Sequence, residues 1–300
     1  FWLKLLTKVQ IQSMARILPL PGFGCGRSVF HPLLAHSTAL QRSTFLDLEA
    51  ERISFSIRST HDAAAKALSL SDADHSTSQP LIPFGFPYGG YIALEMLRQA
   101  IESKKRTSFK ALILCASRSV PDESAVERQG REALLKLARR DADGFEEAVQ
   151  LSCGQSSLSH LLEEEVNVGE KHNFYSSRTK MHAQLQKQCQ DAARFQVGQD
   201  AFCNQLEGVM SRVDTSGALR SINDDEGWSS LPVLIVCGRQ DRVTPLQRHE
   251  EMFELIGGGK QHSALRRFEI VDNAGHMLPL EKPAELAKIV DTFLQEAQME

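Results

Sequence analysis

Two polar residues in the C-terminal part of the chain have types and positions that suit acid–base chemistry. Asp241 follows an apolar run at residues 232–237, and His276 follows another at residues 265–271. A buried carboxylate can orient an imidazole and stabilise its cationic form, which is what general-base chemistry requires. We therefore predict that Asp241 and His276 form an acid–base pair on loops at the ends of neighbouring strands.

A third candidate position lies earlier, in the turn Gly85-Phe86-Pro87-Tyr88-Gly89-Gly90. The segment follows a short apolar run and opens a helix-like stretch, the strand–turn–helix layout in which G-x-S-x-G exposes a serine nucleophile. Residue 87 is a proline, which has no nucleophilic atom and holds φ near about −65°. The sequence therefore predicts an unreactive nucleophile position with negative φ, in a turn whose path differs from that of a serine turn.

The elements that position these residues alternate between apolar runs and helix-like stretches. Continuous apolar runs are typical of strands buried on both faces of a parallel sheet. Near the C-terminus, one helical stripe faces a core and comprises Leu286, Ile289, Val290, Phe293 and Leu294. The order predicts a doubly wound, mainly parallel α/β sheet, with strands at residues 16–20, 43–48, 81–84, 109–115, 232–237 and 265–271.

The pattern between residues 120 and 222 is helical only, which interrupts the alternation of strands and helices. An insertion between two strands of an open α/β sheet lies over the strand ends, where such sheets bind ligands. We therefore expect residues 120–222 to form a helical cap over a core made of residues 14–119 and 223–300. Residues 1–13 carry two lysines and no acid; we interpret them as an N-terminal appendage, with organellar targeting as the alternative.

Taken together, the motifs resemble those of the α/β-hydrolase superfamily, specifically its lid-bearing, esterase-like members. The resemblance runs from about Arg16 to Leu294 and rests on four motifs in the expected order: the loop Pro21-Gly22-Phe23-Gly24, the turn at 85–90, Gly238-x-x-Asp241 and Gly275-His276. It implies that Asp241 is the catalytic acid and His276 the base. It also implies an oxyanion hole made by the N–H groups of Phe23 and Tyr88, with Gly22, Gly85 and Gly89 shaping the loop and the turn.

The chain departs from the family pattern at three prolines. Pro87 replaces the nucleophilic serine, and Pro21 stands where a histidine usually precedes the oxyanion loop. Pro83 falls inside a central strand, where a missing N–H removes one ladder hydrogen bond. The sequence therefore predicts a site that keeps its acid and base and has lost its nucleophile.

Composition excludes several other classes of protein. With 34 basic and 38 acidic residues, a net charge of −4 and no long single-sign run, the chain is not expected to bind nucleic acid or an anionic membrane. The histidines show no metal-ligand spacing, and the glycine loop lacks a dinucleotide pattern, so we expect no metal and no cofactor. Six scattered cysteines without C-x-x-C spacing are typical of reduced thiols in a cytoplasmic protein.

Three functions are compatible with these observations. The first is a degenerate or very weak hydrolase, related to enzymes that cleave small carboxylic esters or amides, with a retained pocket for a small molecule. The second is an enzyme that uses Asp241 and His276 as a general-base dyad without a covalent intermediate. The third is a non-enzymatic ligand-binding protein. The sequence leaves the ligand and the oligomeric state open.

Overall fold

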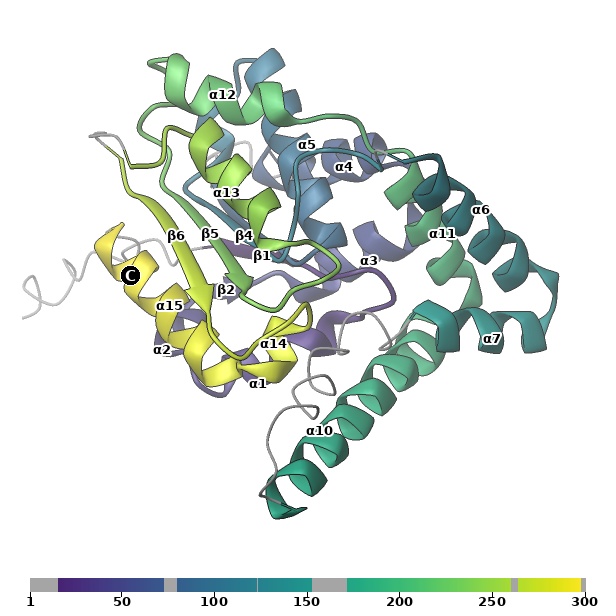
Figure 1. The fold of residues 1–300 in the computed structure, drawn as a ribbon. Coiled ribbons are helices and arrows are strands. Elements are labelled where there is room, and N and C mark those ends of the chain that lie inside the picture. The colour runs from purple at the N-terminus through teal and green to yellow at the C-terminus, as the bar shows by residue number, and fades with distance from the viewer. Residues whose placement is uncertain (1–15, 73–79, 123, 153–171, 260–263, 298–300) are drawn as a thin grey trace, which may run out of the picture.

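The computed structural model describes residues 16–72, 80–122, 124–152, 172–259 and 264–297. Six strands form one sheet in which all neighbouring strands are parallel, in the order β2-β1-β3-β4-β5-β6 (Figure 1). The predicted doubly wound α/β fold is confirmed. The strands are β1 (Arg16–Leu20), β2 (Thr44–Phe45), β3 (Leu81–Gly85), β4 (Leu112–Cys115), β5 (Val233–Gly238) and β6 (Arg266–Val271).

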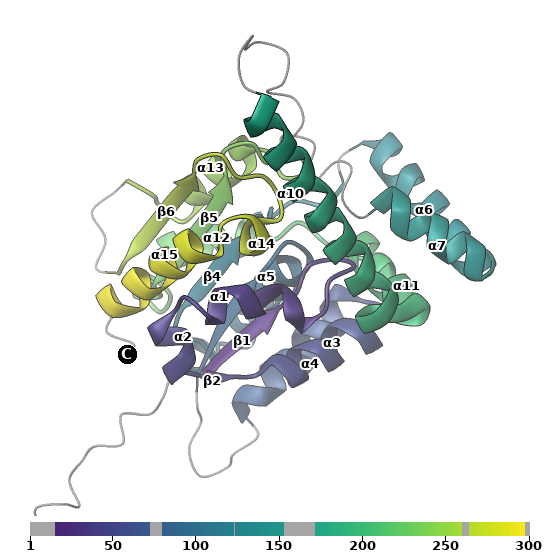
Figure 2. The same ribbon diagram turned by 90° about the horizontal axis from the view of Figure 1, so that it is seen from below.

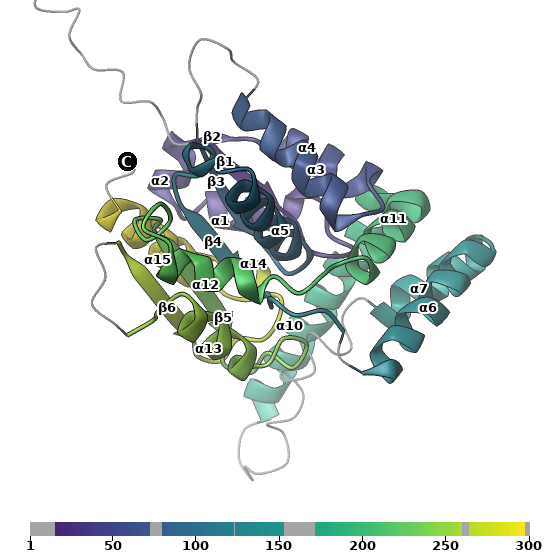
Figure 3. The ribbon, with the colours of Figure 1, turned by 90° about the horizontal axis from the view of Figure 1, so that it is seen from above.

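Alternate residues of the central strands enter two separate hydrophobic cores, one on each face of the sheet. In β4, Leu112 and Leu114 join one core while Ile113 and Cys115 join the other, because successive strand side chains point to opposite faces. The side seen in Figure 3 carries α3 (Asp47–Ser56), α4 (Thr60–Asp72), α5 (Tyr88–Glu102), α12 (Ser216–Asp224) and α13 (Leu246–Leu255). The side seen in Figure 2 carries α1 (His31–Leu34), α2 (Thr38–Arg42), α14 (Leu278–Glu281) and α15 (Pro283–Glu296).

Three strands differ from what their sequences favour, and one of them, β4, begins at Leu112 rather than at the expected residue 109. The strand expected at 43–48 is only Thr44–Phe45, because α3 begins at Asp47 and ends the pairing with β1. β3 runs through Pro83, which lies opposite Leu18 of β1. The remaining residues of β3 hold the strand between β1 and β4 despite the missing proline N–H.

The described part of residues 120–222 contains helices and no strand. The helices α6 (Ala125–Arg140), α7 (Ala142–Ser152) and α10 (His172–Asp191) lie beyond the carboxyl ends of the strands (Figure 1). In contrast, α12 packs against α5 and α13 beside the sheet. The predicted appendage at residues 1–13 lies outside the described residues. The elements that carry the chain from β4 to α12 are α6 (Ala125–Arg140), α7 (Ala142–Ser152), α10 (His172–Asp191), the π-helical turn η5 (Ala192–Val197) and α11 (Gly198–Met210).

Candidate active site

The turn between β3 and α5 brings the start of the helix against the end of β1. The N–H of Phe86 donates to the carbonyl of Leu20 at 2.9 Å, and the N–H of Gly89 donates to that of Pro21 at 2.9 Å. A Cβ atom on Gly89 would lie 2.0 Å from the carbonyl oxygen of Leu20. Only glycine fits at this close approach, so Gly89 sets the distance between the helix and the sheet.

Pro87 occupies the corner of this turn. Its φ is −10° and its ψ is −71°, so φ has the predicted negative sign but lies away from the usual proline value of about −65°. The Pro87 carbonyl accepts hydrogen bonds from the N–H groups of Gly90 (3.0 Å) and Tyr91 (3.3 Å) and from the hydroxyl of Ser117 (3.0 Å). The strand therefore passes directly into α5 through a residue that carries no reactive atom.

The acid and the base predicted from the sequence are in contact. Nδ1 of His276 lies 2.9 Å from Oδ2 and 3.1 Å from Oδ1 of Asp241. Asp241 also accepts hydrogen bonds from the N–H groups of Val243 and Thr244, both at 2.9 Å, and from the hydroxyl of Thr244 at 2.7 Å. The same Thr244 hydroxyl proton lies within reach of the carbonyl of Ala116 at 3.0 Å, so this side chain connects the β5 loop to the end of β4.

The electrostatics of the pair fix which nitrogen of His276 carries the proton. Burial acts to raise the pKa of Asp241, but the neighbouring His276 and the hydrogen bonds from His276 and Thr244 outweigh it and leave the pKa below its ordinary value. An ionised carboxylate can only accept hydrogen bonds, so Nδ1 of His276 is the donor. Nε2 hydrogen-bonds to no described residue and remains available as a proton acceptor.

A cavity of about 290 Å³ adjoins the His276 ring. It is bounded on one side by the sheet loops and on the other by α6, α7, α10 and α11, with a mostly apolar wall. A site of this kind suits a small organic molecule oriented by a few polar groups. Described residues in the wall include Gly22, Phe23, Gly24, Phe86, Pro87, Tyr88, Arg131, Leu134, Leu151, Val209, Val243, His276 and Met277.

Two backbone N–H groups of the cavity wall are unused by the described part of the protein. The N–H groups of Phe23 and Tyr88 donate to no described residue, although both residues line the cavity. Gly24, which follows Phe23 in the chain, has φ of +68°. The N–H of Gly24 donates to the side chain of Gln205 at 2.9 Å. Backbone N–H groups that are held in place and donate to no other protein group can stabilise an oxyanion.

Comparison with known proteins identifies the family of the chain. Residues 17–289 match the profile of the Alpha/beta hydrolase family. The chain belongs to this family. No curated protein matches the chain significantly.

Solved structures share the alpha/beta hydrolase fold with this chain at low sequence identity. A thermophilic esterase from Thermogutta terrifontis is 17% identical, with a TM-score of 0.66 over 94% of this chain and 90% of the esterase. The enol-lactonase from Burkholderia xenovorans LB400 is 15% identical, with a TM-score of 0.60 over 94% and 92% of the two chains. A hydrolase from Pseudomonas aeruginosa is 14% identical, with a TM-score of 0.62 over 94% and 90%.

Three residues of this alpha/beta hydrolase contribute to the site without having been singled out in the sequence. Thr244 follows Asp241 by three positions, a spacing at which short polar side chains close local turns, so a local signal existed. Gln205 and Arg131 carried no such signal, because each reaches the site from the helical segment between β4 and β5.

The described residues of this alpha/beta hydrolase contain no group of metal ligands and no membrane-spanning helix. No three side chains among His, Cys, Asp and Glu are grouped there closely enough to hold a metal ion. No helix there combines the length and apolar character needed to cross a bilayer.

Proposed function

We propose that this protein is a degenerate or very weak hydrolase, related to enzymes that act on small carboxylic esters and amides. Asp241 and His276 take the roles of acid and base, and the N–H groups of Phe23 and Tyr88 form the oxyanion hole. Pro87 occupies the position of the nucleophile and cannot attack a carbonyl carbon. The helical segment beyond the strand ends serves as a cap over a retained pocket for a small molecule.

One observation carries this proposal. Pro87, His276, Phe23 and Tyr88 all line the same cavity, so the oriented imidazole and the two N–H donors face a space with no hydroxyl at the turn. Loss of a triad nucleophile lowers the turnover rate by about 10⁶. The oxyanion hole and substrate binding still leave a rate about 10³ to 10⁴ times that of the reaction in water. Such a protein binds esters with almost no turnover.

A fluorophosphonate probe tests the proposal on the protein as it exists. The reagent forms a covalent bond with an activated serine, so we expect no labelling of the wild-type chain at concentrations that label an active esterase fully. Intact-mass measurement gives the readout and counts the bound groups. A stoichiometric adduct that depends on His276 would mean that another hydroxyl acts as nucleophile and would overturn the proposal.

The orientation of His276 supports a second candidate function. Because Nδ1 donates to Asp241, Nε2 faces the cavity as a base that can activate water or remove a proton without a covalent intermediate. In that case His276→Ala abolishes whatever activity exists, whereas Pro87→Ala leaves it nearly unchanged. Equal small losses in the two variants would count against this second candidate.

The cytoplasm is the compartment we propose for this protein. The five described cysteines are all buried thiols, which suits a reducing environment. Fractionation of cells that express the tagged chain provides the measurement, and recovery outside the cytoplasmic fraction would contradict the assignment.

A further inference from the structure

The cavity beside His276 has a guanidinium group in its wall. Arg131, on α6, lines the cavity among mostly apolar side chains. The described residues of that wall include no carboxylate and no other arginine or lysine. A ligand in the cavity therefore meets one strongly basic group at a position distinct from the loops that carry Pro87 and His276.

The guanidinium of Arg131 is hydrogen-bonded to the protein through Nε only, among the described residues. Its Nε donates to Oδ2 of the buried Asp122 at 2.6 Å, while Nη1 and Nη2 donate to no described residue. The side chain is 27% exposed. The helix under it begins with a capping box in which Ser124 and Glu127 satisfy each other's backbone N–H groups. The guanidinium is thus fixed through Nε, and its two Nη groups can donate a pair of parallel hydrogen bonds to a carboxylate.

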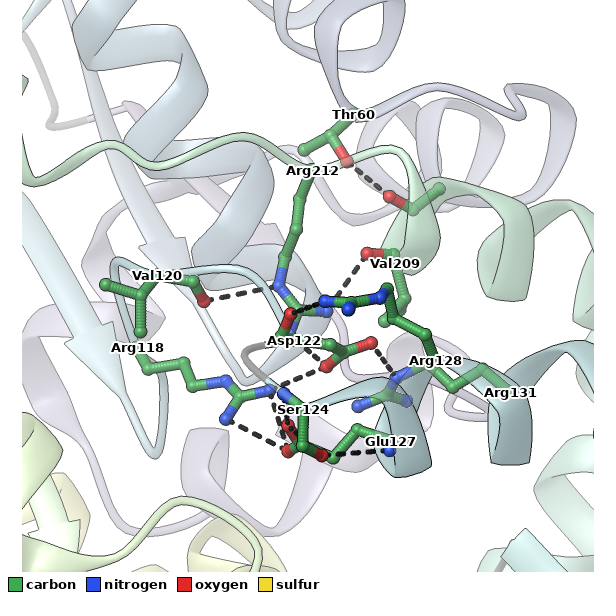
Figure 4. Close-up of polar contacts among 11 residues, drawn as sticks. Thr60, Arg118, Val120, Asp122, Ser124, Glu127, Arg128, Arg131, Val209 and Arg212 are labelled. Atoms are coloured by element: carbon green, nitrogen blue, oxygen red, sulfur yellow. Dashed lines mark hydrogen bonds and ion pairs between the residues drawn. The ribbon is translucent and has the colours of Figure 1, made fainter.

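The carboxylate of Asp122 binds two other arginines besides Arg131. Its Oδ1 accepts hydrogen bonds from Arg118 at 2.7 Å and from Arg212 at 2.6 Å (Figure 4). Both arginines are buried, and the guanidinium of Arg212 also lies over the ring of Tyr91 at 4.3 Å. Three guanidinium groups therefore surround one buried carboxylate, two at Oδ1 and Arg131 at Oδ2.

The whole cluster carries an excess of positive charge. Four guanidinium groups meet two carboxylates in the contacts of Figure 4, so the formal charge is +2; the members are Arg118, Arg128, Arg131 and Arg212 with Asp122 and Glu127. Charge that is partly buried is screened weakly. An anion on the cavity side of Arg131 would reduce this excess.

We infer that Arg131 is a specificity-determining residue that binds a carboxylate of the ligand. The cavity then takes small molecules with an apolar body and a free carboxylate, set apart from the ester, lactone or amide carbonyl that faces His276 and the backbone donors. The inference rests on the proposed function, since it assigns the substrate class of the same pocket. Arg131 takes no part in bond making and acts only by charge and hydrogen bonding.

Calorimetric titration of the intact protein with a matched pair of probes tests the inference. The pair is 4-phenylbutanoate and its neutral amide, which differ in charge and hardly in shape. We expect the wild-type chain to bind the acid about 10-fold or more tightly than the amide, as hydrogen bonds to a charged group provide. Arg131→Met, which keeps an apolar stem of similar length, should abolish the difference while the affinity for the amide stays the same.

Two further variants separate recognition from structure. Arg131→Lys keeps the charge and should retain part of the preference for the acid. Arg128→Met is the matched control, because Arg128 lies on the same helix, donates only to the Asp122 backbone carbonyl among the cluster contacts and does not line the cavity. This variant lowers the charge of the cluster by one but removes no donor in the cavity wall, so it should keep most of the preference for the acid.

The outcomes distinguish the inference from the proposed function. If the wild type binds the acid no more tightly than the amide, or if Arg131→Met still binds the acid more tightly, the inference is wrong. The retained pocket is supported in both cases, because the amide binds. If neither probe binds at millimolar concentration, both the carboxylate site and the retained pocket are refuted. A preference for the acid that is lost only at Arg131 supports both.

Discussion

Oδ2 of Asp241 accepts a hydrogen bond from Nδ1 of His276 at 2.9 Å, although the two residues are 35 positions apart in the chain. The contact forms because β5 and β6 are parallel neighbours, which brings the loops at their carboxyl ends to one edge of the sheet. The same edge carries Pro87 at the end of β3. The carboxylate and the imidazole therefore meet at the end of the sheet where Pro87 also lies.

Thr244 is expected to hold Asp241 in place. In Thr244→Val, Asp241 and the carbonyl of Ala116 lose the one hydroxyl proton that they share, so we expect a loss of about 1–3 kcal/mol in the free energy of unfolding. The pKa of Asp241 should rise toward its ordinary value, because one of the groups that lowers it is removed. Urea denaturation and an NMR titration of the carboxyl carbon give the two readouts.

A second threonine provides the control for this variant. Thr292 on α15 donates only to the carbonyl of Lys288 within its own helix, and Thr292→Val should change stability by less than about 0.5 kcal/mol. Equal effects of the two substitutions would show that the Thr244 contacts add nothing specific to the site.

Gly89 is expected to tolerate no side chain. Because an added Cβ would meet the backbone of Leu20 at 2.0 Å, Gly89→Ala should destabilise the fold by about 1–3 kcal/mol or more. In contrast, a Cβ on Gly130 of α6 meets no heavy atom within 4 Å, so Gly130→Ala should stabilise its helix by up to about 1 kcal/mol. Denaturation curves compare the two variants, and a neutral Gly89→Ala would contradict the close approach.

His249 makes the fold sensitive to acid. Burial lowers the pKa of this imidazole to about 4, and its Nε2 has no hydrogen-bond partner among the described residues. Since the unfolded chain binds this proton near pH 6.5 and the folded chain near pH 4, stability should fall as the pH drops between these values. The loss attributable to His249 is about 3 kcal/mol.

His249→Leu removes this titrating group and tests its contribution. The free energy of unfolding of the variant should decline less steeply than that of the wild type between pH 6.5 and pH 4. NMR of labelled histidine should show the wild-type ring still neutral at pH 5. A ring that is protonated near pH 6, or an unchanged slope in the variant, would contradict the prediction.

The sequence was sufficient for the parts of the fold that depend on local pattern. The apolar runs at residues 109–115 and 232–237 predicted the buried parallel strands β4 (Leu112–Cys115) and β5 (Val233–Gly238), and the parallel order predicted that Asp241 and His276 would meet. β2 was predicted too long, because the two-residue strand gives way to a helix that the periodicity of residues 43–48 did not reveal.

Contacts made by the helical segment between β4 and β5 could not be predicted in this way. Gln205 reaches the glycine loop across 181 positions, and Arg212 reaches Asp122 across 90. These partners are selected by how the helices pack in three dimensions, which neither residue type nor spacing specifies. The same holds for the burial of His249 and for the place of Arg131 in the cavity wall.

Restoring the hydroxyl tests the central claim most directly. Rates of 4-nitrophenyl acetate hydrolysis, with fluorophosphonate labelling as a second readout, should be compared among the wild type, Pro87→Ser and the double variant Pro87→Ser/His276→Ala. Because removal of a triad nucleophile costs about 10⁶ in turnover, we predict that Pro87→Ser gains hydrolysis by about 100-fold or more and becomes labelled. The double variant should lose both. A folded Pro87→Ser protein with no gain over the wild type, or a gain that survives the loss of His276, would contradict the account.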